Sequence, residues 1–118
     1  MKRDMDFIRE ILLRLEQHNY LDGMEGHSAS EIAYHVSLLE GAGLVTQEIY
    51  CNLFLNDSML EGIRITWLGH EFLDSSRNAS VWEKAKNITI EKTGALSFEV
   101  LKAVLVQLGI NAVSSITT

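Results

Sequence analysis

The segment SASEIAYHVSLLEGAGLV, from Ser28 to Val45, contains a complete helix and the first residues of a strand. Ser28 and Glu31 have the spacing of a capping box, in which each side chain binds an orphan backbone N–H at the helix start. The buried stripe predicted from helical spacing consists of Ala29, Ile32, Ala33, Val36 and Leu39. Ala42-Gly43 then ends the helix, because glycine adopts the left-handed backbone conformation without strain.

An earlier helix is predicted from about Met5 to His18, with Asp4 as its cap. Its apolar residues recur at helical spacing: Met5, Ile8, Ile11, Leu12 and Leu15. Residues 20–27 follow, and their two glycines favour a turn or a short extended segment over a further helix.

A β-hairpin is predicted after the Ser28–Val45 segment. Its strands run from Leu44 to about Phe54 and over residues 62–67, where apolar and polar residues alternate, and a loop at residues 56–58 joins them. Thr66 is placed to cap a third helix that ends near residues 75–78. The resulting order of helix, turn, helix, hairpin and helix is typical of a winged helix.

Two more helices are predicted in the C-terminal part of the chain. A capping box at residues 80–83 starts the first, and Ser97 caps the second. The second is apolar on nearly every side, more than one buried stripe requires, so we expect a homodimer contact through Val100, Val104 and Val106. The uncharged residues 109–118 are predicted to be either a disordered tail or an added strand.

The predicted fold class is therefore mostly α with a small β-hairpin (α+β), a winged-helix-like domain with two additional C-terminal helices. A chain of 118 residues, 47% of them hydrophobic, is suited to one core. We assign residues 1–78 to the winged-helix-like core, residues 79–108 to a helical extension of the same domain, and residues 109–118 to the tail.

Four motifs carry a resemblance to a known family. They are Lys2-Arg3-Asp4-Met5-Asp6, Ile32-Ala33-Tyr34-His35, Thr66-Trp67-Leu68-Gly69-His70-Glu71-Phe72-Leu73-Asp74 and Val81-Trp82-Glu83-Lys84. In this order they resemble a bacterial and prophage winged-helix-like family of unknown function. The resemblance implies a winged-helix-like fold and a frequent phage setting, and it supplies no catalytic residues. The uncharged tail departs from the family pattern, in which charged helical sequence is usual.

The sequence favours a cytoplasmic protein without cofactor or catalytic activity. Charged residues interrupt the apolar positions near the N-terminus, so neither a signal peptide nor a membrane span is predicted. Cys51 is the single cysteine and forms no intrachain disulfide. The four histidines lack the paired spacings of zinc sites, and no nucleophile motif or glycine-rich phosphate loop occurs, so we expect no metal, no cofactor and no enzyme.

The distribution of charge disfavours DNA as the partner. The formal net charge is -6, and no lysine or arginine lies between Arg14 and Arg64, an interval that contains the Ser28–Val45 helix and most of the hairpin. Phosphate binding draws its free energy from such cations. A DNA-binding regulator of winged-helix type nevertheless stays open as the alternative, with contacts from Ser30, Tyr34, Ser37 and Arg64.

We expect a protein partner, bound through the Ser28–Val45 helix and the hairpin. Apolar side chains crowd the hairpin tip, where the protein's own core offers little cover. The predicted partner-binding residues are Tyr34, Leu38, Phe54, Leu55, Asp57, Met59 and Leu60. A third reading is an acidic phage protein that occupies a host nucleic-acid site by mimicry. Trp67 and Trp82 are expected to pack in the core or at its rim.

Overall fold

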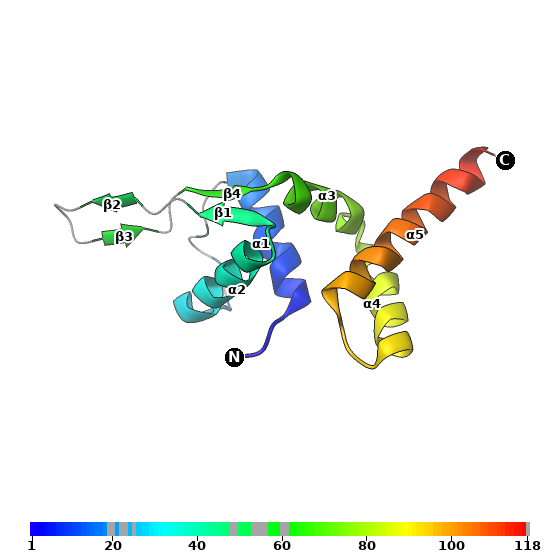
Figure 1. Ribbon diagram of the computed structural model, residues 1–118, viewed down its shortest axis with the longest axis horizontal. Coiled ribbons are helices and arrows are strands. Elements are labelled where there is room, and N and C mark those ends of the chain that lie inside the picture. Colours follow the sequence, from blue (N-terminus) through cyan, green and yellow to red (C-terminus); the bar gives the residue numbers. More distant parts are fainter. Residues whose placement is uncertain are drawn as a thin grey trace. The chain divides into compact units, whose positions relative to one another are not determined.

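The computed structural model describes residues 1–18, 21, 24, 26–47, 50–52, 57–59 and 62–117 (Figure 1). Its elements follow in the order α1 (Met5–His18), α2 (Ala29–Gly41), β1 (Val45–Gln47), β2 (Tyr50–Asn52), β3 (Asp57–Met59), β4 (Ile63–Ile65), α3 (Trp67–Ser76), α4 (Ala79–Thr93) and α5 (Phe98–Thr117). The chain forms two compact units, which we call unit one (Met1–His70) and unit two (Glu71–Thr118). The predicted fold class, mostly α with a small antiparallel hairpin, is confirmed.

In unit one, α1 and α2 pack against each other and against the β1–β4 pair (Figure 1). The antiparallel register places Val45 opposite Ile65 and Gln47 opposite Ile63. A second, separate antiparallel pair is formed by β2 with β3, which lie between β1 and β4 in the chain. The core of unit one consists of Met5, Phe7, Ile8, Ile11, Leu12, Leu15, Leu21, Val36, Leu39, Leu44, Val45 and Ile63. The predicted bounds of α1 are confirmed.

The predicted buried stripe of α2 is partly wrong. Val36 and Leu39 are buried, but Ala29 and Ala33 are exposed to solvent and Ile32 is half-buried. The buried arc of the helix includes His35, which the sequence analysis did not assign to the core. The imidazole of His35 therefore occupies a buried position on the inner face of α2, where only apolar side chains were predicted.

Thr66 joins the end of α2 to the start of α3. Its hydroxyl donates to the Gly43 carbonyl at 2.6 Å and accepts from the Gly69 N–H at 3.1 Å. The Thr66 N–H donates to the Leu44 carbonyl at 3.0 Å. The predicted cap of α3 is thus confirmed. The same residue also binds the backbone of Gly43 and Leu44, just before β1.

In unit two, α4 and α5 pack together over an aromatic core. The Phe72 ring meets Trp82 edge-to-face at 6.1 Å and Phe98 at a tilt, with centroids 5.2 Å apart. The start predicted for α4 is wrong, because the cap is Asn78, whose Oδ1 accepts from the Val81 N–H at 3.0 Å. The helix therefore begins before Ser80, which lies in its first turn.

The tail prediction is also wrong, because α5 runs continuously from Phe98 to Thr117. Residues 109–117 are therefore neither an added strand nor disordered. This segment contains no proline, and Gly109 is its one glycine, so nothing in it ends the helix. The compact units divide within α3, after His70. The proposed boundary after residue 78, between the winged-helix-like core and its helical extension, stays a prediction.

Candidate functional site

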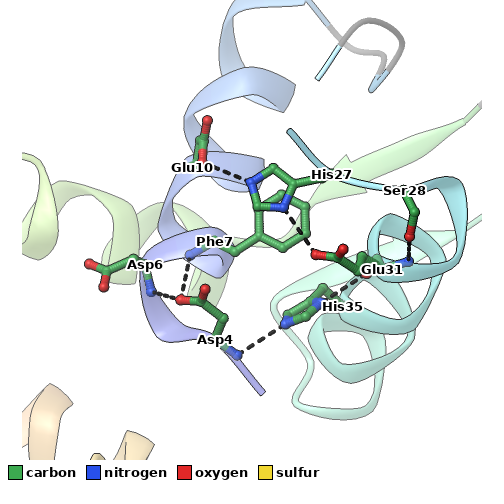
Figure 2. Close-up of polar contacts among 8 residues, drawn as sticks. All are labelled: Asp4, Asp6, Phe7, Glu10, His27, Ser28, Glu31 and His35. Atoms are coloured by element: carbon green, nitrogen blue, oxygen red, sulfur yellow. Dashed lines mark hydrogen bonds and ion pairs between the residues drawn. The ribbon is translucent and has the colours of Figure 1, made fainter. Parts of the chain in front are cut away.

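A cluster of polar and aromatic side chains joins the N-terminal residues, α1 and α2 (Figure 2). His35 is 2% exposed, and both of its ring nitrogens are engaged. Nε2 accepts the Asp4 N–H at 3.0 Å, and Nδ1 lies 2.8 Å from the Glu31 carbonyl oxygen. A backbone N–H can only donate, so Nε2 carries no proton and Nδ1 donates to Glu31. This neutral imidazole ties the segment before α1 to α2.

The second histidine of the cluster, His27, lies between two carboxylates (Figure 2). Its Nδ1 is 3.1 Å from Glu31 Oε2, and its Nε2 is 3.9 Å from Glu10 Oε2. The His27 ring stacks on Phe7 with centroids 3.8 Å apart and an interplanar angle of 10°. These contacts join the residue before the Ser28 cap to α1.

Glu31 completes the predicted capping box and also binds His27, because its carboxylate accepts a hydrogen bond from the Ser28 backbone. Ser28 Oγ accepts the Glu31 N–H at 3.1 Å as predicted, and His27 Nδ1 lies 3.1 Å from Glu31 Oε2. The hydrogen bond from His27 lowers the pKa of Glu31 below its usual value of 4.5. A carboxyl with a lowered pKa stabilises the fold above that usual value, and the contribution is lost as the pH falls through the lowered pKa.

The polar atoms of the cluster bind one another and the backbone of α2 and of the segment before α1. No hydroxyl or thiol nucleophile contacts either histidine in the contacts described for the cluster. In the described part of the chain, no group of three His, Cys, Asp or Glu side chains is arranged to hold a metal ion. The cluster thus positions the outward face of α2.

That outward face, which we call the α2 surface, consists of Ser30, Ala33, Tyr34, Ser37 and Leu38. Ser30, Ala33 and Ser37 are exposed, whereas Tyr34 and Leu38 are half-buried at one edge. Tyr34 packs against His35 edge-to-face at 5.4 Å, so the histidine cluster supports its ring. The helix carries Glu31 and Glu40 and no lysine or arginine.

The hairpin residues predicted to bind a partner are placed in part. Asp57 and Met59 belong to β3, where Asp57 pairs with Asn52 and Met59 with Tyr50. Phe54, Leu55 and Leu60 lie outside the described residues. Arg64, proposed for the DNA alternative, is exposed on β4 opposite Thr46.

Two features beside these residues could not be predicted from the sequence. Because the Asp4 N–H binds His35, the exposed Lys2 and Arg3 are held close to α2. Trp67 is 83% exposed in the first turn of α3, so its expected place in the core or rim is wrong, whereas Trp82 is buried as predicted. The buried residue in this first turn is Gly69, and Trp67 lies on another face of the helix.

On α5, the residues predicted for self-association differ in exposure. Val100 and Val104 are half-buried, whereas half of Val106 is open to solvent. Further exposed apolar side chains follow Val106 along the helix, at Ile110 and Val113. None of the helices within the described ranges is long and apolar enough to cross a membrane.

These features define a small, mostly helical α+β protein in which a histidine cluster lies beneath an uncharged face of α2. The chain belongs to the family described as hypothetical protein DUF2513, whose model matches residues 2–95 and so includes α1 to α4. A Haemophilus influenzae protein described as uncharacterized is 38% identical over 110 residues, which cover 88% of this chain and 92% of the relative. No solved structure matches the chain significantly.

Proposed function

We propose that the chain is a non-enzymatic, winged-helix-like interaction protein of bacterial or prophage origin that acts in the cytoplasm. It binds a protein partner through the α2 surface and the hairpin, and it acts as a homodimer. The observation that carries this proposal is the α2 surface itself, because three of its residues are exposed and no cation lies on the helix.

The α2 surface has the composition of a protein contact. Ser30, Ala33 and Ser37 are small, so a partner can approach the helix backbone closely. Tyr34 forms one edge, held by His35, and an ordered aromatic ring loses little entropy on binding. Glu31 and Glu40 lie on the same helix, and they favour a partner whose rim is basic.

The order of elements in unit one supports the winged-helix part of the proposal. α2 is followed directly by the β1–β4 pair, with β2 and β3 as its extension, and α3 begins at the end of β4. In a winged helix the helix before the hairpin is the one that contacts the ligand. This position belongs to α2.

A DNA-binding regulator is the second candidate, and one observation favours it. The Asp4–His35 hydrogen bond holds Lys2 and Arg3 close to the helix that has no cation of its own. Lys2 and Arg3, together with the exposed Arg64 on β4, are the cations that we propose for phosphate contacts in this alternative. Ser30, Tyr34 and Ser37 then face the base edges.

The double substitution Ser30→Lys with Ser37→Lys separates the two candidates. New cations strengthen binding to phosphates, whereas two long side chains on a close-packed face obstruct a protein partner. We expect the double variant to recover less than about a tenth of the partner that the wild type recovers, with each disrupted contact costing about 1 kcal/mol or more. The measurement is a quantitative pull-down from the native cell, with and without nuclease.

The matched control is Ser80→Lys, an exposed serine in the first turn of α4, which should leave recovery unchanged. Circular dichroism must show that all three proteins are folded. Recovery that survives in the double variant, or that nuclease abolishes in the wild type, contradicts a protein partner at the α2 surface.

A further inference from the structure

An exposed apolar stripe runs along α5 on the side opposite its packed face. It consists of Ala103, Val106, Ile110 and Val113, at intervals of three, four and three residues. Val106, Ile110 and Val113 are 50%, 52% and 61% exposed, and Ala103 is also exposed. Alternating steps of three and four residues form the contact seam of paired helices.

Within unit two, α5 already uses another face. Leu101 and Leu105 are fully buried there, and α5 packs against α4. The C-terminal half of α5 extends beyond α4 on the side where α4 begins, as Figure 1 shows. The exposed stripe is thus not part of the core of unit two. This agrees with the prediction that the helix has more apolar surface than one buried stripe requires.

The charge of the helix indicates what kind of surface covers the stripe. From Ala103 to Thr118 the chain contains no Asp, Glu, Lys or Arg. A charged partner would lose hydration there without gaining an ion pair, so the matching surface is itself uncharged and apolar. The same stripe on a second copy of the chain has these properties, and a two-fold axis pairs the patch with itself.

We infer that the Ala103–Val113 stripe of α5 pairs with the same stripe of a second chain, and that this helix pair is the dimer contact. The inference deepens the self-association in the proposed function and names the residues that carry it. Of the residues predicted from the sequence, only Val106 belongs to this contact, because Val100 and Val104 are half-buried in the single chain. Ile110 and Val113 are exposed and are assigned to the contact in their place. The α2 surface takes no part in this contact.

Sedimentation velocity on the full chain tests this inference. The wild type at about 50 μM should sediment with twice the 13.3 kDa mass of one chain. Val106→Glu and Ile110→Glu should each weaken self-association at least about tenfold, because two carboxylates would be buried at the two-fold contact. Gln107→Glu is the matched control, since it adds the same charge at an exposed neighbouring position off the stripe, and it should remain a dimer.

Every result of this experiment either supports or overturns the α5 dimer contact. A wild type that is monomeric at about 50 μM, or stripe variants that remain dimers, would overturn the inference. If Val106→Glu or Ile110→Glu fails to fold, Val113→Glu carries the same test near the end of the helix, away from α4. The Ser30→Lys, Ser37→Lys variant should still dimerise, so a failure of the α2 proposal is distinguishable from a failure of the α5 contact.

Discussion

Gly69→Ala is expected to destabilise the protein by about 3 kcal/mol, an overpacking effect at the upper end of the usual range. A Cβ at position 69 would overlap the Leu44 carbonyl oxygen and lie 2.7 Å from Ile65 Cγ2. The carbonyl belongs to the backbone that Thr66 holds through its own N–H, so it cannot move without breaking that hydrogen bond. Helix propensity predicts the opposite sign, because alanine is favoured over glycine within a helix.

Gly41→Ala is the control, because a Cβ there meets nothing within 4 Å. It should be neutral or stabilising by up to about 1 kcal/mol. The measurement is the free energy of unfolding in urea for both variants. Equal stabilisation by the two alanines would show that α3 does not approach Leu44 as closely as the structure has it.

Trp82→Ala is expected to cost about 3–5 kcal/mol, the usual loss for a large buried aromatic side chain. The side chain is 2% exposed and meets Phe72 edge-to-face. Lys86 Nζ lies 5.7 Å from the ring centroid, so a cation–π contact is lost together with the packing. Removing the indole leaves a cavity in the core of unit two that the surrounding helices can close only in part.

The chain offers a matched control for this substitution in its other tryptophan. Trp67→Ala removes the same side chain from a position that is 83% exposed, and it should change the free energy of unfolding by less than about 0.5 kcal/mol. Thermal and urea denaturation of the two variants give the comparison. Similar losses for both variants would contradict the assignment of Trp82 to the core and of Trp67 to the surface.

Elements with local signals were predictable from the sequence. The bounds of α1 follow from its apolar period, and the starts of α2 and α3 follow from hydroxyl caps that act within three residues. The start of α4 was missed because Asn78 and Ser80 are both good caps, and local preference does not choose between them. The end of α5 was missed because residues 109–117 lack the charge pattern that marks one solvated face.

The candidate site was less predictable, because its contacts join distant positions. Tyr34, Ser30 and Ser37 could be placed on one helix face from spacing alone. The Asp4–His35 hydrogen bond links residues 31 positions apart, and no sequence period marks such a pair. The exposure of Trp67 likewise depends on which side of α3 packs against its neighbours. Gly69 is the residue of this turn that lies against Leu44 and Ile65, and Trp67 is left exposed.

Fluorescence anisotropy with random duplex DNA is the most direct test of the central claim that the α2 surface contacts protein and not nucleic acid. The isolated protein near physiological salt should bind with a Kd weaker than about 10⁻⁵ M, because α2 has no cation to release phosphate counterions. Tight binding with a steep salt dependence would contradict the account. If Lys2→Gln with Arg3→Gln then reduced that affinity, the regulator would be the correct function.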